Sequence, residues 1–373
     1  MFPVLIVSRG DIVYNTQQPF RVKEAQMKKA KIGIVGLGFM GTTHWGVYKG
    51  LKNAQIVALA DVDAKKRRGD VSAVVGNIGG GNNSKPLDLT GVTVYEDARA
   101  LIGNADVDIV DICVPTPDHA DIVCAALAAG KHVFCEKPLC RDATQMKRIV
   151  AAAKKAKTFF NVGLCVRAWP EYRHAYEYFK SGKAGKMKSA TFKRISPSVD
   201  GNAWRNWFMD GKMSGGALLD LHVHDADEVN YFFGMPKSVT AVGVTGIVSK
   251  GGVDHVVATY DYGDGTLVMA EGGWAAAKGT PFEISFTIVC EKATLKLDAS
   301  GYHIYPVKGK AITPKLDVKA GPTGWHQELA YFVNCVAKGV KPEKYQTIDS
   351  VEATMKLIFA EEKSVMVGKP VRL

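Results

Sequence analysis

The stretch Lys31-Ile-Gly-Ile-Val-Gly-Leu-Gly-Phe-Met-Gly41 joins a short apolar run to three glycines spaced Gly-x-Gly-x-x-Gly. Residues 32–35 predict a buried strand, and the apolar spacing over 39–51 predicts a helix directly after it. In that setting Gly36 permits a tight turn, Gly38 lets the backbone approach a pyrophosphate, and Gly41 lets the helix pack close to the strand. The stretch therefore predicts a dinucleotide-binding turn rather than a purely structural one, with Phe39 and Met40 at the helix N-terminus that faces the phosphates.

Asp61 follows the second predicted strand, 20 residues beyond Gly41. A carboxylate at this place accepts hydrogen bonds from the ribose hydroxyls of adenosine and repels a 2′-phosphate. We therefore expect NAD as the cofactor. The basic residues close by (Lys65, Lys66 and Arg67) keep NADP as an alternative.

The first half of the chain alternates between predicted strands and helices. The expected strands are 32–35, 55–60, 92–95, 107–114, 132–135 and 159–163, and the expected helices are 39–51, 96–102, 119–129 and 141–155. Nearly continuous apolar strands that alternate with helices are typical of a doubly wound parallel sheet covered on both faces. The fold class is therefore α/β in this part of the chain.

The pattern changes after about residue 165. Alternating runs over 238–248, 254–262, 266–274, 282–290, 293–297 and 302–307 predict a large, mostly antiparallel sheet, with helices over 171–180, 217–233, 325–337 and 350–367. We expect an N-terminal extension (1–26), a dinucleotide-binding domain (27–165) and a C-terminal α+β domain (166–373) for substrate binding and oligomerisation. A glycine-rich loop over 76–90 interrupts the first domain.

The composition excludes several classes of protein. The chain has 373 residues, 47% of them hydrophobic and 23% charged, which indicates folded domains rather than disorder. No apolar run reaches the roughly 18 residues of a membrane-spanning helix. The net charge of +11 is scattered, so we expect neither nucleic acid nor membrane as a partner. The seven cysteines form no Cys-x-x-Cys motif and indicate a reducing, cytoplasmic location.

Two motifs follow the fourth and fifth predicted strands. Thr116, Pro117 and His119 belong to a proline-rich turn at the edge where the nicotinamide-side ribose would lie, although such a sequence is also an ordinary turn. Glu136 and Lys137 come directly after a buried strand, where ligands bind in this architecture. Lysine at that place is a candidate acid, base or hydrogen-bond donor, and the alternative is a solvated ion pair.

A third motif lies in the second half of the chain, where two glycines lead into Asp220 and His224. On one continuous helix these two side chains are four residues apart and share a face, which suits proton transfer. A metal site through His222 and His224 is disfavoured, because the two diverge by about 200° on a helix. The structural alternative is an ion pair on the helix surface.

Three further residues are candidates for binding a polar substrate. Arg167 follows the last strand of the first domain and could reach the ligand. Trp204 and Asn206 lie in a segment rich in aromatic rings and hydrogen-bond donors, suited to stacking on a sugar ring. The tryptophans of this segment fit a hydrophobic core equally well.

Taken in order, these motifs resemble the glucose–fructose oxidoreductase/inositol dehydrogenase (Gfo/Idh/MocA) family over residues 30–373. The resemblance implies a Rossmann domain, a C-terminal α/β domain whose open sheet often forms oligomer interfaces, and therefore a homodimer or homotetramer. It also implies bound NAD(P), with Lys137, Asp220 and His224 as the catalytic residues. His222 departs from the glycine of many members, which leaves the shape of the substrate pocket open.

The expected activity is hydride transfer between nicotinamide and a carbinol carbon of a sugar, inositol or related polyol. In this scheme His224 removes the hydroxyl proton with help from Asp220, while Lys137 holds the oxygen. Two alternatives stay open: a sugar-modifying lyase or hydrolase that recycles tightly bound NAD, and a non-catalytic cofactor-binding sensor on the same fold. The identity of the sugar and the direction of the reaction are not determined by these motifs.

Overall fold

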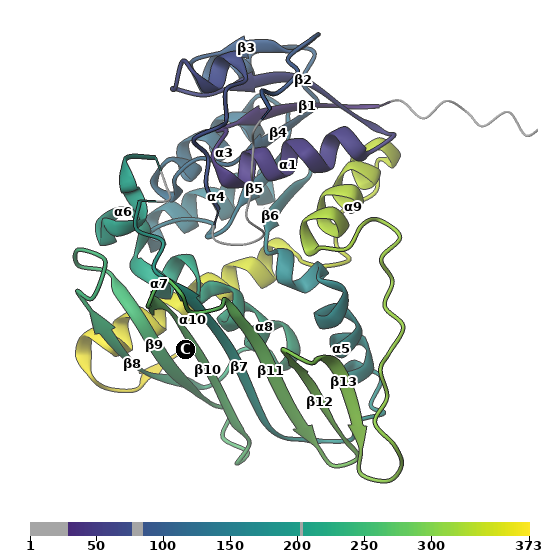
Figure 1. Ribbon diagram of the computed structural model, residues 1–373, viewed down its shortest axis with the longest axis vertical. Helices are drawn as coiled ribbons and strands as arrows, with labels where there is room; N and C mark the ends of the chain where they lie inside the picture. The colour runs from purple at the N-terminus through teal and green to yellow at the C-terminus, as the bar shows by residue number, and fades with distance from the viewer. Residues whose placement is uncertain (1–28, 77–84, 202–203) are drawn as a thin grey trace, which may run out of the picture.

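The computed structural model describes residues 29–76, 85–201 and 204–373. Its N-terminal part contains a six-stranded parallel sheet with the strand order β3-β2-β1-β4-β5-β6, which confirms the doubly wound topology (Figure 1). The strands are β1 Ala30–Val35, β2 Ala54–Ala60, β3 Thr93–Tyr95, β4 Ile109–Ile112, β5 His132–Glu136 and β6 Phe160–Gly163. The helices of this part are α1 Phe39–Gly50, α2 Ala98–Ile102, α3 His119–Ala128 and α4 Ala143–Lys155.

Helix α9 (Gly324–Lys338), late in the sequence, packs against this first sheet. Its buried residues Leu329, Phe332 and Val333 join the core cluster that also contains Ile32 of β1 and Tyr48 of α1. Helices α2, α3 and α4 contribute to the cluster on the other face. The division of the chain near residue 165 stays a prediction, and α9 crosses it to complete one face of the parallel sheet (Figure 1).

The second sheet has eight strands in the order β13-β12-β11-β7-β10-β9-β8-β14. Every pairing is antiparallel except that of β7 with β10, so the expected mostly antiparallel sheet is confirmed. Its strands are β7 Met187–Pro197, β8 Ser238–Thr245, β9 Val253–Asp261, β10 Leu267–Ala276, β11 Glu283–Cys290, β12 Ala293–Asp298, β13 Gly301–Pro306 and β14 Val371–Arg372.

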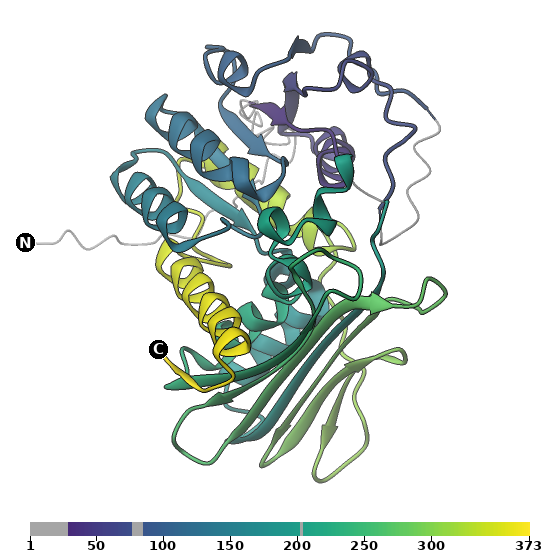
Figure 2. The same cartoon turned by 90° about the vertical axis from the view of Figure 1, so that its left-hand side faces the viewer.

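Helices cover one face of this second sheet, as the view in Figure 2 shows. They are α5 Pro170–Lys180, α7 Gly216–Asp220, α8 Val223–Phe233 and α10 Ile348–Val367, whereas the short helix α6 Gly211–Ser214 packs against the turn after β4. The other face carries part-exposed polar and charged side chains, such as Lys193 beside Glu271 and Glu283. Assembly into a dimer or tetramer through this sheet stays a prediction.

The single helix expected over 217–233 is wrong, because the chain breaks at Leu221–His222 between α7 and α8. The buried ring of His222 turns into the core, where its Nε2 lies 3.0 Å from Glu361 Oε2 of α10. Gly272 on β10 leaves the necessary room, since a Cβ there would lie 2.6 Å from His222 Nδ1. These tertiary contacts override the local helical pattern.

Three further expectations concern the cysteines, membrane-spanning helices and two segments outside the main elements. All seven cysteines are free thiols. Within the described part of the chain, no helix has both the length and the apolar character needed to cross a membrane. The N-terminal extension expected over 1–26, and residues 77–84 of the loop expected over 76–90, lie outside the described residues.

Candidate active site

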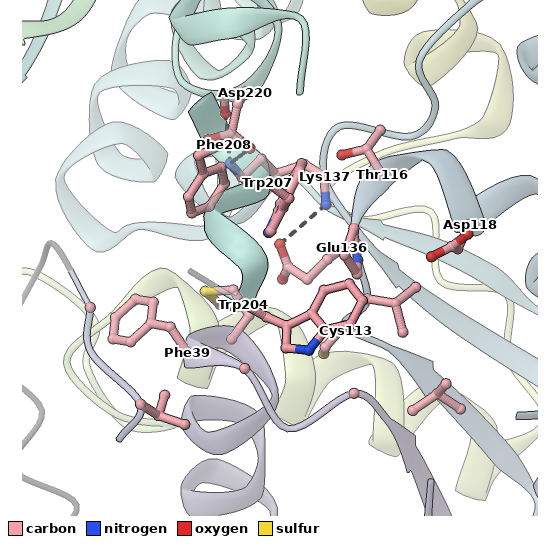
Figure 3. Close-up of a pocket in the computed structure, with 18 of the residues that line it drawn as sticks. Phe39, Cys113, Thr116, Asp118, Glu136, Lys137, Trp204, Trp207, Phe208 and Asp220 are labelled. Atoms are coloured by element: carbon pink, nitrogen blue, oxygen red, sulfur yellow. Dashed lines mark hydrogen bonds and ion pairs between the residues drawn. The ribbon is translucent and has the colours of Figure 1, made fainter. Parts of the chain in front are cut away.

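A cavity of about 1030 Å³ runs along the carboxyl edge of the parallel sheet and continues into the second domain (Figure 3). One end is lined by the glycine-rich turn after β1, with Gly38, Phe39 and Met40. The other end is lined by residues of β11 and β12, including Ile284 and Leu297. Strands β1 and β4 lie at the switch point of the doubly wound sheet, where this architecture binds its ligands.

The glycine-rich turn forms a cradle that is open on the cavity side. Gly36 has φ +92°, and a Cβ there would lie 2.7 Å from the Cys113 carbonyl oxygen. A Cβ on Gly41 would collide with the Gly36 carbonyl, so this glycine permits the close packing of α1 on the turn. Gly38 lines the cavity, and no atom lies within 4 Å of the position of its missing Cβ. The cradle thus has room for a phosphate against the backbone, as a dinucleotide requires.

Asp61 at the end of β2 is oriented by the same turn. Its Oδ2 accepts a hydrogen bond from the Leu37 amide at 2.7 Å, and its Oδ1 accepts one from the Asp63 amide at 2.8 Å. The carboxylate is largely buried and lines the cavity next to the cradle. This placement fits the predicted contact with the ribose hydroxyls of a cofactor.

The turn after β4 contributes less to the cavity than the sequence predicts. Thr116 lines the cavity, but Pro117 and His119 do not. The buried His119 ring lies between two backbone carbonyls, with Nδ1 at 3.0 Å from Pro138 O and Nε2 at 2.9 Å from Val114 O. The cofactor role predicted for His119 is therefore contradicted, because its ring ties two strand-end turns together inside the protein.

Glu136 lines the cavity from the end of β5 and is held by a histidine that the motif analysis missed. His44 of α1 lies with Nε2 at 3.1 Å from Glu136 Oε1 and Nδ1 at 2.8 Å from Asp111 Oδ2. Burial lowers the pKa of His44, but the charge and hydrogen bond of Asp111 outweigh it, and the pKa lies well above its usual value. A protonated imidazole attracts both carboxylates, although only its contact with Asp111 has the geometry of a hydrogen bond.

His44, Asp111 and Cys113 also bring nitrogen, oxygen and sulfur atoms within 4.8 Å of one another, a grouping that could hold a metal ion. The three side chains already contact each other, since Cys113 Sγ lies 3.4 Å from His44 Nδ1. Burial, followed by the Asp111 charge, raises the pKa of the Cys113 thiol to about 12, which disfavours the thiolate that a metal would need. The absence of a metal stays a prediction.

Lys137 meets Asp220 across the two domains (Figure 3). Its Nζ donates to the Asp220 backbone carbonyl at 2.6 Å and to Asp220 Oδ1 at 3.3 Å. The carbonyl is available because α7 ends at Asp220, and the last carbonyls of a helix have no partner within it. The two side chains keep 15% and 12% of their surface exposed, so both reach the cavity.

His224 lines the same part of the cavity from the first turn of α8. Its side chain is buried, and Nδ1 has no hydrogen-bond partner among the described residues. Burial, and then the positive charges of Lys137 and Arg194, lower the pKa of His224 well below its usual value of 6.5. The imidazole is therefore neutral near pH 7 and can accept a proton. Asp220 and His224 thus reach one cavity from two short helices, not from the single helix face that their spacing predicts.

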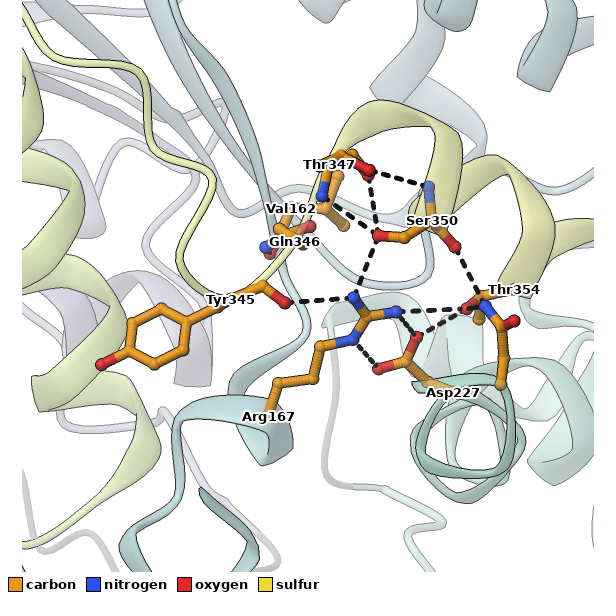
Figure 4. Close-up of polar contacts among 9 residues, drawn as sticks. Val162, Arg167, Asp227, Tyr345, Gln346, Thr347, Ser350 and Thr354 are labelled. Carbon is orange, nitrogen blue, oxygen red and sulfur yellow. Dashed lines mark hydrogen bonds and ion pairs between the residues drawn. The ribbon is translucent and has the colours of Figure 1, made fainter. Parts of the chain in front are cut away.

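The substrate role predicted for Arg167 is contradicted. Its guanidinium is completely buried and is paired with Asp227 at 2.7 and 2.6 Å (Figure 4). It also donates to Ser350 Oγ and to the Tyr345 carbonyl, at 3.0 and 3.2 Å. Arg167 therefore joins the end of the first domain to α8 and to the start of α10, behind the cavity wall.

The aromatic segment behaves in two ways. Trp204, 39% exposed, and Trp207 line the cavity, as the stacking prediction requires. Asn206 does not line it, because its side chain closes its own loop through hydrogen bonds to Asp200 Oδ1 and the Gly201 amide. Arg205 and Asn206 adopt φ +50° and +52°, which forms the tight turn between the two tryptophans.

Three polar residues at the substrate end were missed by the motif analysis: Glu171, Tyr172 and Arg194 line the cavity. Tyr172 Oη and Glu171 Oε2 are buried and have no hydrogen-bond partner among the described residues. Arg194 is held by Asp225 at 2.9 Å. Only the packing of α5 and β7 against α8 brings them together. The sequence gives one weak signal of their role, because they are polar residues beside apolar ones in amphipathic elements.

Two models of one protein family match this chain. The model of the oxidoreductase family with the NAD-binding Rossmann fold, Gfo/Idh/MocA, matches residues 30–164, and the model of the Gfo/Idh/MocA C-terminal domain matches residues 172–296. The chain belongs to the Gfo/Idh/MocA oxidoreductase family. Its first domain is accordingly an NAD-binding Rossmann domain.

Two relatives in this family are named as dehydrogenases of myo-inositol and of levoglucosan. The chain is 28% identical over 260 residues to myo-inositol 2-dehydrogenase of Thermotoga maritima, a match that covers 67% of this chain and 70% of that enzyme. It is 30% identical over 238 residues to levoglucosan dehydrogenase of Pseudarthrobacter phenanthrenivorans, which covers 61% of this chain and 58% of the relative.

Solved structures share the fold over nearly the whole chain. Levoglucosan dehydrogenase in complex with NADH and levoglucosan superposes with a TM-score of 0.78 at 20% identity, covering 92% of this chain and 99% of that chain. The apo scyllo-inositol dehydrogenase of Lactobacillus casei gives a TM-score of 0.71 at 22% identity, with 93% and 99% covered.

The cradle geometry predicts that one glycine substitution weakens cofactor binding and that another lowers the stability of the fold. Gly38→Ala should leave the thermal stability unchanged but weaken NADH binding about tenfold, equal to about 1.4 kcal/mol, because the new methyl group enters the space for the phosphates. Gly41→Ala should instead destabilise the fold by about 1–3 kcal/mol through overpacking. Thermal melts and fluorescence titration with NADH measure the two effects, and unchanged NADH affinity in Gly38→Ala would place the phosphates elsewhere. Titration with NADPH checks the preference expected from Asp61.

The buried ion pair predicts a large loss of stability. Asp227→Ala leaves the Arg167 charge buried without its carboxylate and should lower the free energy of unfolding by about 3–5 kcal/mol. Replacing both partners (Arg167→Met with Asp227→Leu) should recover most of that loss. Urea denaturation measures each value, with Glu177→Ala as a control that breaks a solvent-facing ion pair with Arg173 and should cost under about 1 kcal/mol. A small loss in Asp227→Ala would mean that water reaches Arg167.

Proposed function

We propose that this protein is an NAD-dependent dehydrogenase that acts on a carbinol carbon of a sugar or polyol. The observation that carries the proposal is the corner where Lys137, Asp220 and the neutral His224 meet at the cavity. A protein that only bound the cofactor would not need a base and a positioned cation at one point. The family membership and the named relatives support the same reaction class.

The residues present fit an NAD molecule. The open cradle at Gly38 and the turn at Gly36 would hold the pyrophosphate, and Asp61 would accept hydrogen bonds from the adenosine ribose. Thr116, Glu136 and Lys137 line the part of the cavity between this cradle and the second domain. When bound, NAD supplies the carbon that accepts a hydride. The Asp61 carboxylate favours NAD over NADP, since it would repel a 2′-phosphate.

His224 acts as the general base in this proposal. Its Nδ1 has no partner among the described residues and its low pKa keeps it neutral, so it can accept the proton of a substrate hydroxyl. Lys137 donates a hydrogen bond to the same oxygen and stabilises the negative charge that develops as the proton leaves. Asp220 holds the ammonium of Lys137 in place through its carbonyl and its carboxylate. In the reverse direction the same groups return the proton to a carbonyl oxygen.

Substitutions in this corner should separate catalysis from cofactor binding. Lys137→Ala and His224→Ala should each lower turnover at least ~10²-fold and leave NADH affinity nearly unchanged, because neither residue forms the cradle. Asp220→Asn should cost less, and the double change Lys137→Ala with His224→Ala should cost less than the sum of the two. Steady-state rates on a panel of inositols and aldoses, beside NADH titration, test this.

A matched control for these variants is Lys147→Ala, which removes an exposed lysine of α4 that does not line the cavity. It should keep the parental rate. A His224→Ala variant that also kept the parental rate would show that His224 is not the general base.

The low pKa of His224 predicts the pH profile of the oxidation. Because the neutral imidazole is the active form, kcat/KM should fall only as the pH drops through the pKa of His224, which lies well below 6.5. Activity governed by this group should therefore stay level from about pH 6.5 upward. A pH series of kcat/KM measures the acid limb. A midpoint at or above 6.5 would show that another group sets it.

A further inference from the structure

The chain that joins α7 to α8 carries two residues of the proposed reaction centre. Asp220 is the last residue of α7 and His224 lies in the first turn of α8, and both line the cavity. His222 lies midway between them, does not line the cavity and is completely buried. Because each of the two is only two positions away along the chain, a shift of His222 moves at least one of them.

The backbone of His222 is bonded to both helices. Its amide donates a hydrogen bond to the Ala217 carbonyl of α7 at 2.8 Å, and its carbonyl accepts hydrogen bonds from the amides of Asp225 and Ala226 in α8 at 2.9 and 3.0 Å. Helix α7 is a five-residue helix, too short to be stable through its own hydrogen bonds. The position of α7 relative to α8 therefore depends on where His222 is held.

The side chain of His222 lies in a socket built from β9, β10 and α10. Its Nε2 lies 3.0 Å from Glu361 Oε2 of α10, and Glu361 Oε1 accepts a hydrogen bond from Tyr260 Oη of β9 at 2.8 Å. Gly272 of β10 gives the imidazole its space, since a Cβ there would lie 2.6 Å from His222 Nδ1. The socket thus ties the junction of α7 and α8 to the second sheet and to α10.

The contact between His222 and Glu361 is a buried ion pair. Burial lowers the pKa of His222, but the contact with Glu361 outweighs it, and the pKa lies above its usual value of 6.5. Asp225 adds to this rise and Arg194 opposes it. Tyr260 stays neutral, because burial raises its pKa well above the usual 10. Any displacement of His222 separates two buried charges, so the pair leaves the junction few alternative positions.

We propose that His222 is a positioning residue, whose pairing with Glu361 sets the geometry of the reaction-centre residues on either side of it. This inference rests on the proposed function and adds to it a residue that acts without lining the cavity. An apolar socket would support the fold equally well, because apolar side chains of similar size often replace a buried ion pair without loss of stability. It would not hold the junction in one position, and a displacement of about 1 Å in a reaction centre can cost about 100-fold in rate.

A triple variant that makes the socket apolar (His222→Leu with Tyr260→Phe and Glu361→Leu) tests the proposal. The melting temperature should stay within about 4 °C and the NADH affinity within about twofold of the parental values, because the cofactor cradle is untouched. On a sugar or polyol that the parental protein oxidises, kcat should fall at least about tenfold while KM stays within about threefold. A parental kcat would show that packing alone positions these residues and would overturn the inference.

The protonation state of His222 gives a readout that is independent of turnover. A pH titration of histidine-labelled protein followed by ¹⁵N NMR should give His222 a midpoint above 6.5, with its signal assigned from its absence in the triple variant. A midpoint at or below 6.5 would mean that the ring carries no stabilised charge, and would overturn the inference.

Ser364→Ala is the matched control on the same helix. Ser364 is buried three residues after Glu361, accepts a hydrogen bond from the Ala241 amide at 2.9 Å and donates one to the Lys369 carbonyl at 2.7 Å. Its loss should lower the melting temperature and leave kcat and KM at the parental values. A loss of turnover as large as that of the triple variant would overturn the inference, because any weakening of α10 would then have the same effect.

A second variant serves if the triple variant does not bind NADH. Glu361→Gln keeps the size of the side chain and an acceptor for Tyr260 but removes the charge that holds His222, and it should lower kcat at least about threefold. A parental kcat in Glu361→Gln would overturn the inference and leave the proposed function standing. A parental protein that binds NADH but oxidises none of the inositols and aldoses would overturn the proposed function itself.

Discussion

The candidate site depends on one contact, in which the Lys137 ammonium donates to the carbonyl and the carboxylate of Asp220. Lys137 follows the last residue of β5, and Asp220 ends a five-residue helix in the other domain. The contact places a cation, an acidic group and, one turn later, His224 at a single point of the cavity. Burial, and then this cation together with Arg194, lower the pKa of His224, so Lys137 influences both the position and the protonation state of the groups at this point.

Buried charges around this contact hold its two sides in position. His44 fixes Glu136, the neighbour of Lys137, between α1 and β5. His222 and Glu361 pin the chain break between Asp220 and His224 against α10, and Tyr260 donates a further hydrogen bond to Glu361 at 2.8 Å. Buried ion pairs add little to net stability, but they leave few alternative arrangements. Their effect here is to limit the positions that Lys137, Asp220 and His224 can take.

The two domains are also joined by parts of the chain that carry no polar motif. Helix α9 returns from the second half of the sequence to cover the first sheet with Phe332 and its neighbours. Arg167 connects the end of the first domain to α8 and α10. The two domains share a hydrophobic core and ion pairs, and the cavity lies between them. The cofactor cradle and the substrate end of the cavity therefore face each other in a defined geometry.

The sequence by itself determined the doubly wound fold class, the glycine turn and the strand-end placement of Asp61 and Lys137, because each follows from local period and turn chemistry. It did not determine Arg167, His119 or Asn206, whose side chains resemble ligand groups but are used by internal partners. The break at His222 depends on Glu361 and Gly272, and the corner formed by Tyr172 and Arg194 depends on α5 and β7 meeting α8. Such contacts between distant residues have no period along the chain, so only the tertiary structure decided them.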